Sequence, residues 1–537
     1  APTRSSWITG MHAISNGTQP MRSGFEIPDS IRFYNELLQE AGYYTSNCSK
    51  TDYNLRGSNG RNPKEFWNYS GGDYAGTWKK REKGQPFFTV YNIGDSHESR
   101  AFGDHKDESV DPKKMILAPY HPDLPEMRNT YAKYASAISK MDSLVGQAIE
   151  NLKRDNLYEN TIVIYNSDHG GVLARSKRFL YSSGIHCPLI VRIPAKWNHL
   201  FPQGKKPGST IDRIVSFIDM PKTWVSLTGA AMKKNFQGRI FLGPDTEPPA
   251  DYHFSWRERA DERFDNVRVM RDEQFAYHKN YAPFAPNGQY LAYMHNMKAT
   301  GAWERHHQAG KTNAVTGRFF EPRPSEEFYD NFKDFHNIDN QIDDPLHQSK
   351  IKELKKELRR QQLQYFDSGL MPEEMRNRIT KEKKMTVYAF VRDPKLYPLA
   401  KYLDFADLAL ARKKGNLKTF SKGLHDSDPV IRYWSVVGLL LLEKHAQPAL
   451  PGLKKALNDS DEIPSLAAWA IFKAGEKDFA KQWMLMEITQ NPGNKMLANV
   501  LDWMDRDSFS ILARIPQEKL PQRGLLKDVV KRYRARI

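Results

Sequence analysis

The chain contains an aspartate and a histidine, Asp168 and His169, directly after a run of apolar and β-branched residues at 161–166. In α/β proteins, residues that follow a buried strand lie at the carboxyl end of the sheet, where ligands bind. Two glycines come next and allow the backbone to turn sharply or to be approached closely. Basic residues follow, among them Lys177. Carboxylate, imidazole and ammonium groups within one loop predict a metal ion held beside a bound anion.

Two other polar segments follow predicted strands in the same way. Lys50 comes just after an expected strand at 43–47, and His97 comes just after an expected strand at 87–93. A single lysine or histidine is more often solvated or structural, and an Asp-His pair alone is often a helix cap. Three such strand ends, separated by helical patterns such as that at 126–154, favour a mostly parallel α/β sheet with one composite site.

Further elements are expected around these strands. The periodicity predicts a helix at 29–41 that begins at Asp29, a residue type that caps helices well. Later patterns predict a helix within 211–227, a hairpin at 267–281, a strand and turn at 326–340 and a charged amphipathic helix at 349–366. The change of pattern after residue 250 indicates a smaller α+β subdomain.

The last third of the chain is helical in pattern and contains a weak repeat. The sequence LHDSD at 424–428 recurs as LNDSD at 457–461, a spacing of 33 residues, and each copy precedes an apolar helix. A repeat of this length predicts a short α-solenoid of the HEAT type, and a compact helical bundle is the alternative. The expected domains are an α/β core at 1–250, an α+β subdomain at 251–380 and a helical domain at 385–537.

Composition limits the class of protein. A chain of 537 residues is too long for one core, and 39% hydrophobic residues support folded domains. The net charge of +16 favours a polyanionic partner, although a solvated basic surface is the simpler interpretation. No apolar run is long enough to span a membrane. Cys48 and Cys187 allow either one disulfide or two free thiols.

Taken together, the motifs over residues 1–375 resemble the formylglycine-dependent (type I) sulfatases of the alkaline phosphatase superfamily. The resemblance is carried by Ala1-Pro2-Thr3-Arg4, Ser49-Lys50-Thr51-Asp52, His97, Asp168-His169, and Lys177 four residues before Tyr181. Each motif is weak alone, and their order and spacing make the resemblance specific. It implies an alkaline-phosphatase-like, mostly parallel sheet sandwiched by helices, followed by the α+β subdomain and the helical domain.

The resemblance also implies roles for individual residues. It makes Arg4, Lys50, His97 and Lys177 catalytic, with Arg4 orienting the nucleophile, both lysines binding sulfate and His97 acting as general acid. Asp168 and His169 would bind one Ca2+. Substrate-binding candidates are Asp52, Arg100, His186, Arg257, Arg259, Asp261, Arg22 and His12. Asp52 replaces the usual histidine of the family and His186 the usual arginine, and the residues at 257–263 could instead form only ion pairs.

In that family, a Cys or Ser before x-Pro-x-Arg is oxidised to formylglycine, whose hydrate attacks sulfur. The nucleophile is therefore expected at the position just before Ala1. The paired aspartates of the family and its first strand are expected further upstream. By this resemblance the chain lacks its first strand and should be inactive on its own.

The predicted function is hydrolysis of sulfate esters on a sulfated oligo- or polysaccharide by a periplasmic or secreted enzyme from a bacterial source. No nucleic acid partner is expected, and the sequence leaves the oligomeric state open. One alternative is a phosphatase or phosphodiesterase of the same superfamily, typically with two zinc ions. The other is a non-catalytic relative that binds sulfated polysaccharide. The residue before Ala1 would separate these readings.

Overall fold

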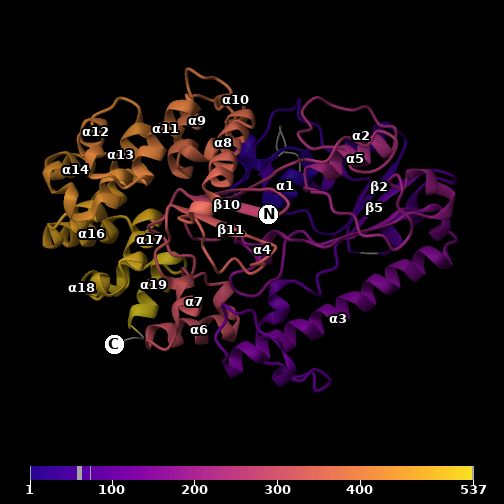
Figure 1. The fold of residues 1–537 in the computed structure, drawn as a ribbon, viewed down its shortest axis with the longest axis horizontal. Helices are drawn as coiled ribbons and strands as arrows, with labels where there is room; N and C mark the ends of the chain where they lie inside the picture. Colours follow the sequence, from indigo (N-terminus) through magenta and orange to yellow (C-terminus); the bar gives the residue numbers. More distant parts are fainter. Residues whose placement is uncertain (1, 57–62, 73, 535–537) are drawn as a thin grey trace.

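The computed structural model describes residues 2–56, 63–72 and 74–534, so Ala1 of the N-terminal motif lies outside it. An α/β region at the N-terminal end of the chain occupies one side of the molecule (Figure 1). Helices in orange and yellow, from the last third of the chain, occupy the other side. A small β-sheet lies between the two.

The first sheet is parallel and has the strand order β4-β2-β5. Strand β2 (Tyr44–Cys48) pairs in register with β5 (Phe87–Tyr91) on one side and with β4 (Tyr69–Ser70) on the other. Before β2, helix α2 (Tyr34–Glu40) packs against α1 (Pro2–Thr9) and α5 (Asp219–Leu227). A short parallel pair, β1 (Phe25–Glu26) with β3 (Leu55–Arg56), lies outside this sheet.

The helix expected from Asp29 begins later, at Tyr34. The reason is local, because the Glu36 carboxylate accepts a hydrogen bond from the backbone N–H of Phe33 at 3.0 Å. A carboxylate in the first turn satisfies a helix N–H that has no partner within the helix. The prediction of Asp29 as the capping residue was wrong.

Two strands flank the loop that contains Asp168. The 30-residue helix α3 (Pro125–Arg154) leads into β6 (Val163–Asn166), which pairs with β7 (Leu189–Arg192). The two strands are antiparallel, because the connection holds only the four-residue helix α4 (Ser182–Ile185) and no crossover helix. Within the described residues, β5 and β6 each keep one edge without a strand partner.

The predicted hairpin, strand and amphipathic helix after residue 250 are confirmed. They form an antiparallel sheet of β8 (His253–Arg257), β9 (Val267–Arg271), β10 (Phe275–Asn280) and β11 (Glu326–Asp330), in the order β11-β10-β9-β8. Helix α8 (Gln348–Gln364) covers β9 and β10 with its apolar face, where Ile351, Leu354 and Leu358 are buried. Between β10 and β11 lie α6 (Lys298–Gln308) and α7 (Ala314–Gly317).

The last third of the chain is helical, as predicted. Its helices are α9 (Glu373–Glu382), α10 (Val387–Phe390), α11 (Leu399–Leu410), α12 (Leu417–Gly423), α13 (Pro429–Leu442), α14 (Leu450–Ala456), α15 (Ile463–Lys473), α16 (Lys477–Gln490), α17 (Lys495–Trp503), α18 (Phe509–Leu512) and α19 (Leu525–Arg534). The repeated segments precede α13 and α15, which pack against each other and each against the helix before it. The repeat therefore corresponds to two stacked helix pairs.

The core of the helical region continues into the α+β subdomain. Tyr281 and Phe284 belong to the same buried cluster as Trp434 and Trp469. The ring centroids of Tyr281 and Trp434 are 5.8 Å apart. The described helices include none that is long and apolar enough to cross a membrane. Cys48 and Cys187 are not joined in a disulfide.

Candidate functional site

The predicted site residues gather around one cleft with a volume of about 2540 Å³. Those that line it are His12, Arg22, Lys50, Asp52, His97, Asp168, His169, Lys177, His186, Arg257, Arg259 and Asp261. Of the remaining two, Arg4 is buried at 3% exposure and contacts cleft residues. Arg100 is exposed and is not among the described residues that line the cleft.

Arg4 ties the N-terminal helix to two strand ends. Its guanidinium donates hydrogen bonds to the carbonyl oxygens of Lys50 and Thr51, at 2.6 and 2.8 Å, and to Asn92 Oδ1 at 3.0 Å. A further guanidinium nitrogen lies 3.7 Å from Asp168 Oδ2. One buried cation therefore fixes the loop after β2 and neutralises part of the charge at the end of β6.

Asp168 is the acidic centre of the cleft. Lys50 Nζ lies 3.1 Å from Asp168 Oδ2, and His169 Nε2 lies 3.4 Å from Asp168 Oδ1. Although burial raises the pKa of Asp168, the neighbouring imidazole of His169 and the positive charges of Lys50 and Arg4 hold it well below its usual range. Asp168 is therefore ionised. Its contact with Lys50 brings together the polar residues that follow β6 and β2, as the sequence predicted.

His169 presents a ring nitrogen toward the same point. Its Nδ1 lies 2.7 Å from the carbonyl oxygen of Gly170, which can only accept, so Nδ1 carries the ring proton. Burial lowers the pKa of His169, which keeps the ring neutral and leaves a lone pair on Nε2 facing the carboxylate. Two electron-pair donors this close favour a cation between them, and a metal-bound histidine usually donates its other ring N–H to a carbonyl or carboxylate oxygen, as Nδ1 does here.

The glycines after His169 are required by close backbone contact. Gly170 N donates to Gly184 O at 2.8 Å, and Gly171 N donates to Ser183 O at 3.1 Å. A Cβ on Gly170 would collide with the carbonyl oxygen of Ser183. The close approach predicted for this turn is made by the chain itself, and it fixes the loop that carries Lys177.

Lys177 is held by a buried carboxylate. Its Nζ lies 3.1 Å from Glu98 Oε2, and Glu98 is fully buried. Glu98 also accepts from Arg178 at 2.8 Å, and Arg178 pairs with Asp261 at 2.7 Å. Burial lowers the pKa of Lys177, while the charge of Glu98 opposes this shift. The chain of ion pairs positions the Lys177 ammonium at the cleft wall.

His97 has a defined tautomer. The backbone N–H of Ser99 donates to His97 Nδ1 at 3.3 Å, so the proton of the neutral ring lies on Nε2. Burial, Lys177 and Lys50 lower the pKa of His97 below its ordinary value. A bound anion would offset the two lysines and restore protonation. Proton donation from Nε2 would require the imidazolium form of this ring, in which the Nδ1–H can donate to Ser99 Oγ at 2.9 Å.

The arginines at 257–259 are engaged within the protein. Arg257 lies 3.1 Å from Asp265 Oδ2, and burial lowers its pKa to about 10. Arg259 forms two hydrogen bonds with the Glu373 carboxylate, at 2.5 and 2.9 Å. Both residues line the cleft, yet these pairs favour the ion-pair alternative that the sequence left open.

The other substrate-binding candidates differ in environment. Arg22, Asp52 and His186 are exposed at the cleft surface. His12 is buried, and burial lowers its pKa to about 3, so it is neutral. Its Nδ1 lies 3.4 Å from Trp256 Nε1, which donates. The exposed residues are free to meet a ligand, whereas His12 has a packing role.

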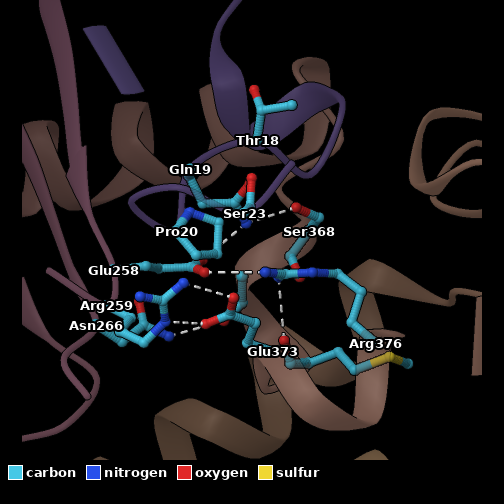
Figure 2. Close-up of polar contacts among 12 residues, drawn as sticks. Thr18, Gln19, Pro20, Ser23, Glu258, Arg259, Asn266, Ser368, Glu373 and Arg376 are labelled. Atoms are coloured by element: carbon cyan, nitrogen blue, oxygen red, sulfur yellow. Dashed lines mark hydrogen bonds and ion pairs between the residues drawn. The ribbon is translucent and has the colours of Figure 1, made fainter. Parts of the chain in front are cut away.

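A buried polar network supports the cleft wall behind these residues (Figure 2). Gln19 donates to Glu258 Oε1 at 2.9 Å and to Ser368 Oγ at 2.7 Å. Arg376 pairs with the other oxygen of Glu258 at 3.2 Å and donates to the carbonyl of Ser368. The N-terminal loop, the end of β8 and helix α9 are thereby joined behind the cleft.

Sequence reasoning missed the residues that position the site rather than line it. Glu98, Arg178 and Asn92 each contact a predicted site residue. Glu98 stands beside His97, and Arg178 stands beside Lys177, so adjacency to a candidate was the available signal. Nothing in the sequence shows which of these side chains would meet.

Comparison with known proteins gives consistent matches. The family profile described as Sulfatase matches residues 1–230. An ulvan-active sulfatase from Formosa agariphila is 31% identical over 424 residues, which cover 70% of this chain and 68% of that protein. An N-acetylglucosamine-6-O-sulfatase from Bacteroides thetaiotaomicron is 28% identical over 134 residues, covering 24% of this chain and 22% of that protein.

Solved structures match this chain at lower sequence identity. One, in complex with D-glucosamine-2-N,6-O-disulfate, is 17% identical with a TM-score of 0.45 and covers 70% of this chain and 89% of its own. Another, a 2-O glycosaminoglycan sulfatase, is 16% identical with a TM-score of 0.44 and covers 68% and 82%.

Proposed function

We propose that this chain, which belongs to the sulfatase family of sulfuric ester hydrolases, removes sulfate from a sulfated oligo- or polysaccharide. The observation that carries the proposal is the meeting of Lys50, His97 and Lys177 in one cleft around Asp168. The net charge of +16 suits a polyanionic substrate. Relatives named for ulvan and for N-acetylglucosamine-6-O-sulfate support a carbohydrate ester.

Lys50 and Lys177 would bind the non-bridging sulfate oxygens. Charge builds on these oxygens as the ester is cleaved, and fixed ammonium groups in a partly buried cleft stabilise it. Lys177 is suited to this role because Glu98 and the backbone of the glycine turn restrict its position. Arg4 would hold the loop of Lys50 in place through its hydrogen bond to the Lys50 carbonyl oxygen.

His97 would act as the general acid. The alkoxide of a sugar is a poor leaving group, so it needs a proton as the ester bond breaks. In the imidazolium form that this role requires, the Nε2–H would be the proton donated, and the Nδ1–H would donate to Ser99 Oγ at 2.9 Å. The nucleophilic oxygen that the reaction requires is what a formylglycine hydrate supplies in type I sulfatases, and we place that residue just before Ala1.

Asp168 and His169 would hold the cation. A carboxylate oxygen suits Ca2+, which takes six to eight ligands and neutralises charge on a bound sulfate. Within the ranges that the structure covers, no group of three or more His, Cys, Asp or Glu side chains could hold a metal ion.

The proposal extends to organisation and location. We assign residues 1–250 to the α/β core, 251–380 to the α+β subdomain and 385–537 to a helical domain of HEAT-like repeats. Stacked helix pairs support the last assignment. A periplasmic or secreted location fits a polymeric substrate that stays outside the cell.

The test is desulfation of a panel of sulfated saccharides by protein that includes the formylglycine residue placed before Ala1, with sulfate release measured by ion chromatography. Lys177→Ala and His97→Ala should each lower kcat/KM about 100-fold or more, the usual contribution of such groups. Lys153→Ala is the matched control, because Lys153 is an exposed lysine paired with Glu150 on α3. Full activity in both site variants would refute the assignment.

Metal analysis separates the main alternative. The sulfatase assignment predicts one calcium per chain and loss of activity on chelation, restored by Ca2+. Two zinc ions per chain and release of phosphate from phosphate esters would instead favour a phosphatase or phosphodiesterase. The non-catalytic relative would be favoured if the protein binds sulfated polysaccharide, shows no turnover and contains no formylglycine by mass spectrometry.

A further inference from the structure

Two large aromatic side chains are exposed at the mouth of the cleft. Phe332 and Phe335 follow β11, line the cleft and are 66% and 47% exposed. Exposed aromatic residues beside a cleft cost hydration free energy and commonly mark binding surfaces. The reaction assigned above uses neither of them.

The loop that carries them is firmly held, so their exposure is a property of the fold. Asn337 is buried; its amide oxygen accepts from the backbone N–H of Ser182 at 2.8 Å, and its amide nitrogen donates to Asn331 at 2.9 Å. Arg175 donates to the carbonyl oxygens of His336 and Asn337, at 2.9 and 2.7 Å. These contacts attach the loop to the segment that carries Lys177.

A positively charged residue lies at the end of the β11-β10-β9-β8 sheet from which the phenylalanine loop emerges. Arg271 ends β9 and stands opposite His253, the first residue of β8, in the strand register. Both residues line the cleft. In the described part of the chain the Arg271 guanidinium has no hydrogen-bond or ion-pair partner; the charge of the neighbouring Asp272 acts on it, and Asp272 itself pairs with Lys350 at 3.2 Å. This guanidinium is therefore available to an anion.

We propose that Phe332 and Phe335 form a stacking platform for a second sugar ring, and that Arg271 binds an anionic group on that part of the substrate. The inference rests on the proposed function and narrows its substrate class to saccharides of at least two rings. The C–H groups on a pyranose face are attracted to the negative face of an aromatic ring. A sulfate or carboxylate on the same saccharide suits an unpaired guanidinium.

The test compares long and short substrates. Phe332→Ala/Phe335→Ala and Arg271→Gln should each lower the ratio of kcat/KM for sulfated tetrasaccharides to that for 4-nitrophenyl sulfate by about tenfold, mainly through KM. Sulfated tetrasaccharides from ulvan and from heparin serve as probes. Phe332→Tyr/Phe335→Tyr should restore the ratio, because the ring faces remain. Phe479→Ala is the control, since Phe479 is an exposed phenylalanine on α16.

Calorimetric binding of the same tetrasaccharides separates this inference from the assigned reaction. Tenfold weaker binding by Phe332→Ala/Phe335→Ala, but not by Phe479→Ala, supports the platform even if no variant hydrolyses any sulfate ester. Equal affinity of all variants would overturn it. A change from dimer to monomer in Phe332→Ala/Phe335→Ala, with unchanged saccharide affinity, would also overturn it by showing a contact between copies.

Discussion

Lys50 and Lys177 have the same side chain in different surroundings. Lys50 is about one-third exposed and faces Asp168, while Lys177 is half as exposed and faces Glu98. Glu98 in turn holds Arg178, so one carboxylate neutralises two cations. At the scale of residues, the chemistry of the cleft depends on a buried partner that no substrate would touch.

Glu98→Gln should therefore affect both stability and activity. Removing one partner of a buried ion pair leaves uncompensated charge, and the expected loss is about 3 kcal/mol of unfolding free energy. Because Lys177 loses its positioning contact, kcat should fall about tenfold. Urea unfolding and saccharide turnover measure the two effects. Glu159→Gln, which removes an exposed partner of Arg192, should change stability by less than about 1 kcal/mol.

An unchanged kcat in folded Glu98→Gln would show that Lys177 does not need this carboxylate. The destabilisation alone would then reflect only a structural ion pair between the loops after β5 and β6.

At the scale of elements, the sequence predicted where strands end but not which distant residues pair in the fold. Residues after strands are recognisable because apolar runs end in polar ones, so the meeting of Lys50 and Asp168 was predictable. The pairing of Arg259 with Glu373 was not, because 114 residues separate them and neither position belongs to a periodic pattern. The antiparallel pairing of β7 with β6 was not predictable either, because the length of the connection between two strands does not fix their relative direction.

Glu462 links two elements in a pH-dependent way. It precedes α15, and its buried carboxylate accepts from the backbone N–H of Glu374 in the first turn of α9 at 2.8 Å. Burial, with the charge of Glu374 second, raises the pKa of Glu462 to about 8. The folded state therefore retains a proton that the unfolded state releases above its ordinary pKa near 4.5.

This contribution to stability is full below about pH 4.5 and is lost as pH rises toward 8. Glu462→Gln cannot ionise and keeps an oxygen acceptor, so it should be more stable than the wild type at pH 9 by about 1–3 kcal/mol. The difference should shrink toward pH 4.5. Urea titrations across this range test the idea, and a difference that does not vary with pH would contradict it.

At the scale of the whole molecule, the helical region packs closely against the α+β subdomain. Arg263 in the loop between β8 and β9 is buried and pairs with Asp502 on α17 at 2.9 Å. Arg532 on α19 pairs with Asp502 and with Glu304 on α6. Together with the shared aromatic core around Tyr281 and Trp434, these contacts join the helical region to the α+β subdomain.

Removal of residues 385–537 should therefore unfold the remaining chain. The truncation would expose Tyr281 and Phe284, which lie in the shared core, and leave Arg263 without its carboxylate. Uncompensated buried charge and lost apolar burial act in the same direction. Circular dichroism and thermal unfolding of residues 1–384 measure the outcome. A cooperative transition near the wild-type Tm would show that the helical domain is dispensable, as the sequence pattern alone predicts.

A point variant tests the same dependence without deleting a domain. Asp502→Asn should cost roughly 3–5 kcal/mol, because Arg263 and Arg532 both lose a buried charge partner. Glu443→Gln, which removes an exposed pair with Lys473 on the same side of the molecule, should cost less than about 1 kcal/mol. If the cleft depends on this interface, Asp502→Asn should also lower the temperature at which saccharide turnover is lost. Loss of stability confined to the helical region, with turnover unaffected up to the wild-type temperature, would mean that the regions unfold independently.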